Sequence, residues 1–268
     1  MNPVNATHSL MGYWGRKARA TWRAWWHVIH MGAQIVVLAL TPSIYTRTAH
    51  RNAVFAHLYT ATAPLLAWFL VLSALVSLVL IRIVVATAYS YGLSQYALEV
   101  LVRTLVLELI PLYSAMFVAA RYAMPAAQAL RGRFARAHRE GSLAPQESLL
   151  ASVLLPRALA AMFSVLLLAA LACVVCLVLT YLTVYGFSPW GLPAYTHSVG
   201  QVFSPTVTLI FSLKTLFFSL AVGVVPLAAS AQSDERGGFS RRSDMSEFAR
   251  LFSVVLLIEV TSLIGNYY

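Results

Sequence analysis

The sequence has few charged residues: Lys, Arg, Asp and Glu make up 10% of the 268 positions, against about 25% in ordinary soluble proteins. Hydrophobic residues make up 60%, against roughly 45–50%. A soluble globule cannot cover that much apolar surface with so few charges, and a disordered chain has the opposite composition. With two cysteines, Cys173 and Cys176, a disulfide scaffold is also excluded. These absences predict an all-α, polytopic membrane protein.

The common catalytic signatures are missing as well. The chain contains no GxxxxGK[ST] phosphate-binding loop and no HExxH zinc motif. It also lacks the GxSxG turn of many serine hydrolases. We therefore expect no enzymatic activity, no cofactor and no metal site in this chain, and any ATP hydrolysis must come from a separate protein.

The gaps between charged residues locate the membrane spans. No charged residue lies between Arg51 and Arg82, or between Arg157 and Lys214. A helix that crosses the bilayer needs about 20 mostly apolar residues, and lipid forces such a stretch to be helical. The continuous apolar runs do not alternate as β-barrel strands do. The sequence predicts five spans, at 61–86, 97–121, 153–181, 206–230 and 249–266.

The distribution of Lys and Arg predicts the orientation. The segments before the first span, after the second and after the fourth are rich in arginine, whereas the connectors near 87–96 and 182–205 have no Lys or Arg. Because cytoplasmic loops carry the basic residues, we expect a cytoplasmic N-terminus and an outer C-terminus. The net charge of +10 follows mostly from this bias.

Residues 12–40 predict an amphipathic helix lying in the membrane surface. Trp22, Trp26 and Ile29 share one predicted face, and Arg19, Arg23 and His30 share the other. Tryptophan opposite basic residues is typical of interfacial helices. Pro64 suits the first turn of the first span.

Ionisable residues inside the predicted spans cost several kcal/mol each on insertion scales, and five of them are singled out as candidates. They are Glu99, Arg103, Glu108, Lys214 and Glu259. Glu99 and Arg103 are spaced to pair on one helix face near its outer end. Glu108 lies near the bilayer centre, and Pro111 can break a backbone hydrogen bond beside it. Lys214 can snorkel outward, pair with Glu108 or Glu259, or meet an anionic headgroup. For this set, mutual neutralisation that fixes the packing and contact with a substrate both remain open.

The second span contains a motif that resembles a known family signature. The stretch from Leu107 to Arg121, LELIPLYSAMFVAAR, resembles the "ELGP…LxxALxVAGR" signature of MlaE-type permeases. Pro156-Arg157 resembles the family's "PR" before the third span, and Lys214 resembles the lysine of its "K(S/T)xxF". Gly237–Arg241 is similar to its glycine-rich loop, and Glu259 stands where the family usually has an aspartate. The stretch Ala126–Glu140 has the length of the family's coupling helix but basic charges.

The resemblance implies the membrane subunit of an ABC transporter in a bacterial inner membrane, moving phospholipid to or from a periplasmic MCE-domain carrier. It implies a homodimer with a lipid cavity at its interface, and a cytoplasmic ATPase docked on the coupling loop 126–150. Glu108, Arg103, Lys214 and Pro111 are the candidate substrate-binding residues, and Glu99 and Glu259 are candidate structural charges. The candidate contacts to the ATPase are Arg131, Arg133, Arg136 and Arg139.

Two other functions remain compatible with the sequence. An ion-coupled secondary transporter could use Glu108 and Glu259, although the chain shows no convincing internal repeat of the kind common in such proteins. A membrane scaffold without transport activity is the other alternative.

Overall fold

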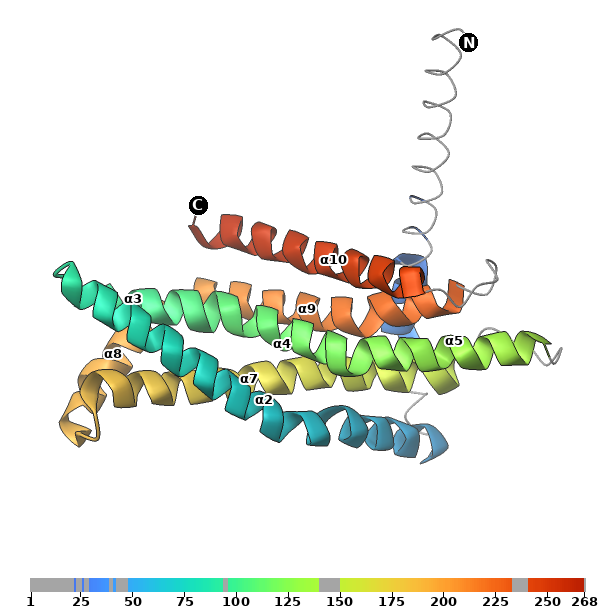
Figure 1. Ribbon diagram of the computed structural model, residues 1–268, viewed down its shortest axis with the longest axis horizontal. Helices are drawn as coiled ribbons and strands as arrows, with labels where there is room; N and C mark the ends of the chain where they lie inside the picture. The colour runs from blue at the N-terminus through green and yellow to red at the C-terminus, as the bar shows by residue number, and fades with distance from the viewer. Residues whose placement is uncertain are drawn as a thin grey trace, which may run out of the picture.

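The computed structural model describes residues 22, 26, 29–38, 41, 48–93, 96–139, 150–232 and 241–267. Within these ranges the chain is almost entirely helical, as predicted, and five helices are long and apolar enough to cross a membrane. They lie side by side as a bundle (Figure 1). The spans are Val54–Ser90, Ala97–Arg133, Ser152–Tyr185, Pro205–Ser230 and Met245–Gly265.

The first span belongs to α2 (Thr48–Ser90), a helix that begins well before the predicted boundary at residue 61. Pro64 therefore lies inside the helix and not in its first turn, so that expectation was wrong. The segment before Pro64 contains nothing that stops a helix, and membrane helices tolerate an internal proline where their surroundings satisfy the freed carbonyl. α2 packs along α7 (Leu155–Tyr185), and a hydrogen bond of 2.8 Å joins the hydroxyls of Thr62 and Ser164.

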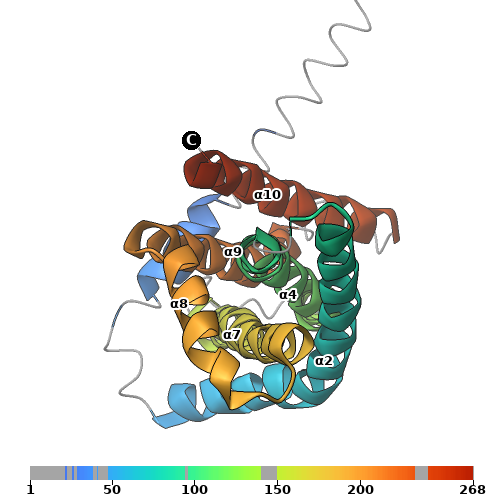
Figure 2. The same cartoon turned by 90° about the vertical axis from the view of Figure 1, so that its left-hand side faces the viewer.

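The second span is built from consecutive helical segments without a break in the chain. They are α3 (Ala97–Leu101), η3 (Val102–Leu109), α4 (Ile110–Val118), η4 (Ala119–Ala123) and α5 (Met124–Arg139). The predicted coupling segment is therefore helical from 126 to 139, as a direct extension of the second span and not as a separate helix after a loop. Residues 140–149 of the predicted loop lie outside the described residues. Seen along the bundle, α4 lies in the middle of the other spans (Figure 2).

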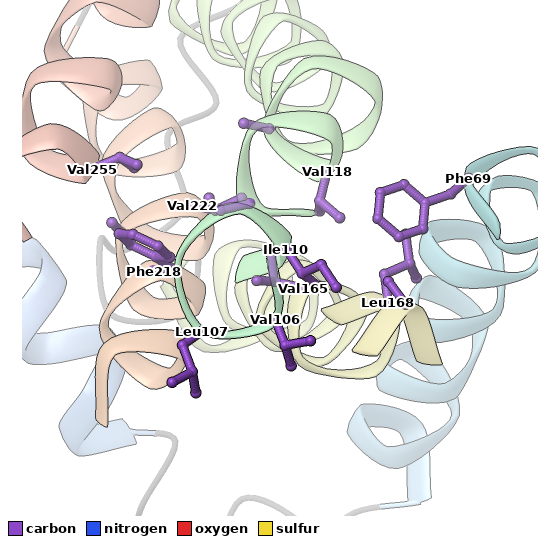
Figure 3. Packing of buried hydrophobic residues seen from close by; sticks show 14 of the residues in the cluster. Phe69, Val106, Leu107, Ile110, Val118, Val165, Leu168, Phe218, Val222 and Val255 are labelled. Atoms are coloured by element: carbon purple, nitrogen blue, oxygen red, sulfur yellow. The ribbon is translucent and has the colours of Figure 1, made fainter. Parts of the chain in front are cut away.

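The hydrophobic core surrounds this central span. Side chains from α2, η3, α4, α7, α9 (Pro205–Gln232) and α10 (Arg241–Tyr267) form one buried cluster, part of which is shown in Figure 3. Ile110, Ala115 and Ala119 are fully buried in it, and the two small alanines let helices approach closely. Gly223 of α9 shows the same effect, because an added Cβ would lie 2.9 Å from the carbonyl oxygen of Ala158 in α7.

The described part of the predicted interfacial segment contains a helix, Ile29–Leu38. Trp22, Trp26 and Ile29, which belong to the predicted apolar face of this segment, are exposed, and this exposure fits a segment lying against lipid. The sequence did not predict that one side of this helix is buried in the protein. Ile35 packs in a second hydrophobic cluster with Leu130, Leu155 and Leu227. The helix is therefore packed on the α5 end of the bundle.

At the opposite end, the turn after α7 is ordered by aromatic side chains. Tyr181 and Tyr195 pack edge to face, with ring centroids 5.2 Å apart, and the Tyr195 hydroxyl donates to the Leu177 carbonyl at 2.8 Å. Burial raises the pKa of Tyr195, so its hydroxyl stays protonated and remains a donor. Gly186 ends α7 with φ +67°, which suits a residue without a side chain. The short helix α8 (Leu192–Val202) follows this turn.

Candidate functional site: a buried charge cluster

The second span carries a distorted backbone where its glutamate lies. η3 is a wide-turned π-helical segment in which the Ile110 N–H donates to the Leu105 carbonyl. Pro111 follows and has no N–H, so nearby carbonyls need other donors. Two side chains from other helices supply them: Lys214 Nζ donates to the Leu107 carbonyl at 3.2 Å, and Cys173 Sγ lies 3.9 Å from the Val106 carbonyl. The proline thus makes a polar backbone site in an apolar span.

Lys214 of α9 joins two carboxylates from two further segments. Its ammonium pairs with Glu108 of η3, and it lies 2.9 Å from Glu259 Oε2 of α10. The residues are 2%, 8% and 9% exposed for Lys214, Glu108 and Glu259, respectively. Lys214 also lies over the Phe218 ring, 5.8 Å from its centroid. The structure therefore brings together three of the five intramembrane candidates singled out from the sequence.

The cluster has one positive and two negative formal charges, so the single Lys214 ammonium is shared between two carboxylates. An ammonium has three donors; Lys214 donates to Glu108 and to the Leu107 carbonyl, and it forms an ion pair with Glu259. Removing charges from water costs several kcal/mol per ion, and close pairing offsets that cost. The cluster thus ties the second, fourth and fifth spans together.

Glu99 and Arg103 form a separate pair, as their spacing predicts. Arg103 Nη2 lies 3.1 Å from Glu99 Oε1, and both side chains are nearly half exposed. The pair lies near the α3 end of the second span. In this conformation Arg103 is therefore not part of the buried cluster.

The predicted ATPase contacts occupy different environments. Arg133 and Arg136 are exposed on α5, whereas the side chain of Arg139 lies outside the described residues. Arg131 points inward and forms an ion pair with Glu247 of α10; the two side chains are 10% and 6% exposed. Sequence reasoning missed Glu247, which lies just before the predicted fifth span. Its only signal is that it is an acidic residue beside an arginine-rich loop.

The fold and the buried cluster define a class of protein: a multi-pass α-helical membrane protein whose apolar spans carry paired charges buried between helices. The sequence profile described as Permease MlaE matches residues 54–263. The chain therefore belongs to the MlaE permease family, and it is a membrane permease of the ABC-transporter type that works with partner proteins. No curated protein sequence matches the chain.

Proposed function

We propose that this permease moves phospholipid or a related lipid between the inner membrane and a periplasmic MCE-type carrier. The observation that carries the proposal is the family match over residues 54–263, which spans the buried cluster and all five apolar helices. A diacyl lipid needs apolar walls for its tails and a few polar groups for its headgroup. Two copies that face each other would provide both, with the N-termini in the cytoplasm.

ATP hydrolysis is assigned to a separate cytoplasmic ATPase. The chain has no phosphate-binding loop of its own, and α5 projects exposed arginines Arg133 and Arg136 from the end of the second span. A continuous helix can carry force from that surface to Glu108. Arg131, turned toward Glu247, is proposed to brace α5 and not to contact the ATPase directly.

The partner proposal predicts the composition of the intact complex. Native mass spectrometry of the protein, purified in mild detergent from its own membranes, should show two copies of this chain with two ATPase subunits, bound lipid and an MCE-domain protein. A permease recovered as a lone monomer under conditions that keep the ATPase folded would contradict the proposed assembly.

Substrate contact at the cluster requires a second conformation. Glu108, Lys214 and Pro111 are buried, and Glu108 and Lys214 contact each other. A lipid headgroup can reach these residues only if it replaces the contact between Glu108 and Lys214 during transport. We propose that Glu108 and Lys214 separate and contact the headgroup. Pro111 keeps the Leu107 carbonyl available beside them, and Arg103 contacts the headgroup nearer the outer surface.

A photo-crosslinking residue at position 108 tests this exchange. We expect lipid adducts that increase when the assembled transporter hydrolyses ATP. The matched control is position 165, because Val165 lies in the same core on α7 and is fully buried; it should give protein adducts alone. If position 108 also yields only protein adducts with and without ATP, the cluster has a packing role and no substrate role.

A further inference from the structure

The cluster of Glu108, Lys214 and Glu259 contains one more carboxylate than ammonium groups. Lys214 Nζ pairs with Glu108 and lies 2.9 Å from Glu259 Oε2, so both carboxylates contact the same nitrogen. All three side chains belong to apolar spans and are at most 9% exposed. A net charge is strongly disfavoured in such surroundings. With both carboxylates ionised, these three side chains carry an excess negative charge that needs a further positive partner.

Arginines of the same and neighbouring helices are engaged or placed elsewhere. Those in other described contacts are Arg103 with Glu99, Arg131 with Glu247, and Arg157 with the Val153 carbonyl. Arg121 of η4 is exposed. Arg250 lies nine positions before Glu259 on α10, which is about 14 Å along the helix axis. The described contacts therefore place one base, Lys214, on the two carboxylates.

Other titratable side chains on the helices packed around the cluster are bound to different groups. They are Cys173 facing the Val106 carbonyl, Tyr113 with Ser73, Tyr195 with the Leu177 carbonyl, and His197 with Gln201. Tyr122 of η4 is a neutral hydroxyl fourteen positions beyond Glu108. These groups do not add a positive charge at Glu108 or Glu259 in the described contacts.

Two buried oxygen atoms of α10 have no hydrogen-bond partner among the described residues. Glu259 Oε2 is held by the charge of Lys214 but accepts no hydrogen bond there, and the Ser262 hydroxyl has no partner either. Ser262 is 9% exposed and lies three positions after Glu259, so both side chains share one helix face. Buried polar atoms nearly always have a partner. The oxygens therefore mark a place where a further hydrogen-bond donor fits.

We propose that the cluster binds one proton, which Glu108 and Glu259 share. A protonated carboxyl group gains an O–H donor, so it can donate to the other carboxylate while Lys214 neutralises that carboxylate. One proton thus removes the excess charge and supplies the missing donor. The proton belongs to the pair and not to either residue alone. Proton binding here does not require that lipid be the transported substrate.

The pH dependence of stability tests the proposal. Between about pH 6 and 7.5, exposed glutamates of the unfolded chain are ionised, whereas the folded cluster keeps its proton. Stability therefore falls as the pH rises, and the unfolding equilibrium constant should increase by up to about tenfold per pH unit from this proton. Glu259→Gln and Glu108→Gln each leave one carboxylate for one ammonium, so each should remove this contribution. Denaturant titrations of the full chain in detergent, at a series of pH values, measure it.

The matched control is Glu247→Gln. Glu247 is a buried carboxylate on the same helix as Glu259, but it pairs with Arg131. Its loss should leave the pH dependence unchanged. Infrared spectra of the unmodified chain give a second readout that does not depend on the folding of a variant. We expect a band of a protonated carboxyl group at neutral pH that shifts with isotope-labelled glutamate, and this band should be absent from whichever glutamine variant of the cluster folds.

The other outcomes overturn the proposal. An equal pH dependence in the unmodified chain and in both glutamine variants means that the pair is fully ionised and that a second positive charge comes from elsewhere. Loss of the pH dependence in Glu247→Gln means an effect not specific to the cluster. Stability that rises with sodium concentration at constant ionic strength, without the pH dependence, means a metal cation in place of the proton. Absence of the protonated carboxyl band also excludes the shared proton.

Discussion

Replacing Lys214 with methionine is expected to destabilise the folded chain by about 3–5 kcal/mol, the usual cost of breaking a buried ion pair from one side. Methionine keeps the length and the apolar stem of lysine but removes the ammonium. Glu108 and Glu259 would then lie close together in an apolar core without their counter-ion. The Leu107 carbonyl would also lose a donor. The free energy of unfolding, measured by denaturant titration in detergent, reports the effect.

The matched control removes the carboxylates together with the ammonium. In the triple variant Lys214→Met/Glu108→Gln/Glu259→Gln, no uncompensated charge remains, and most of the lost stability should return. A loss below about 1 kcal/mol for Lys214→Met alone is the size seen for solvent-exposed pairs. That result would mean that water enters the cluster and that it does not hold the three spans together.

The second large loss of stability is expected when the ion pair between Arg131 and Glu247 is broken. Glu247→Gln should destabilise the chain by about 3 kcal/mol, because Arg131 is left buried beside a weaker acceptor. Arg131→Gln should cost a similar amount. The double variant should cost less than the sum of the two, because the partners act on each other. Unfolding free energies and the ATPase activity of the reconstituted complex are both measured.

Arg136→Gln distinguishes bracing from docking. Arg136 is exposed on the same helix, so its loss should leave stability within about 0.5 kcal/mol and reduce ATPase association. Glu247→Gln should instead leave association intact and uncouple ATP hydrolysis from transport. Additive stability effects at Arg131 and Glu247 would contradict the pairing.

Much of the fold follows from the sequence, because a long apolar stretch within lipid must form a helix to satisfy its backbone hydrogen bonds. The five spans and the exposed tryptophan face of the N-terminal segment were predicted from charge gaps and helical spacing. The ends of the helices were not predicted correctly. α2 begins upstream of Pro64, and α5 continues the second span. Nothing in those segments prevents a helix from extending beyond the bilayer, so hydropathy alone cannot locate its end.

The candidate site was predicted in part. Intramembrane charge marks Glu108, Lys214 and Glu259 individually, and Pro111 marks a freed carbonyl. Spacing along one helix also predicted the pair of Glu99 and Arg103, which the structure confirms. Which residues meet across helices depends on the rotation of each span about its axis, and only packing sets that rotation. The pair of Arg131 and Glu247 was not predicted for this reason.

The unbroken path from Ala97 to Arg139 has a mechanical consequence. Arg139 lies 31 positions beyond Glu108 in the sequence, or about 45 Å at 1.5 Å per residue. A twist applied at Arg139 can reach Glu108 along one helical path without a hinge loop, and the wider coil of η4 between them can absorb part of the torsion. α10 pairs directly with this helical path at Glu247, and at Glu259 it is joined to Glu108 through Lys214 of α9, so a rotation of the second span is coupled to both other helices.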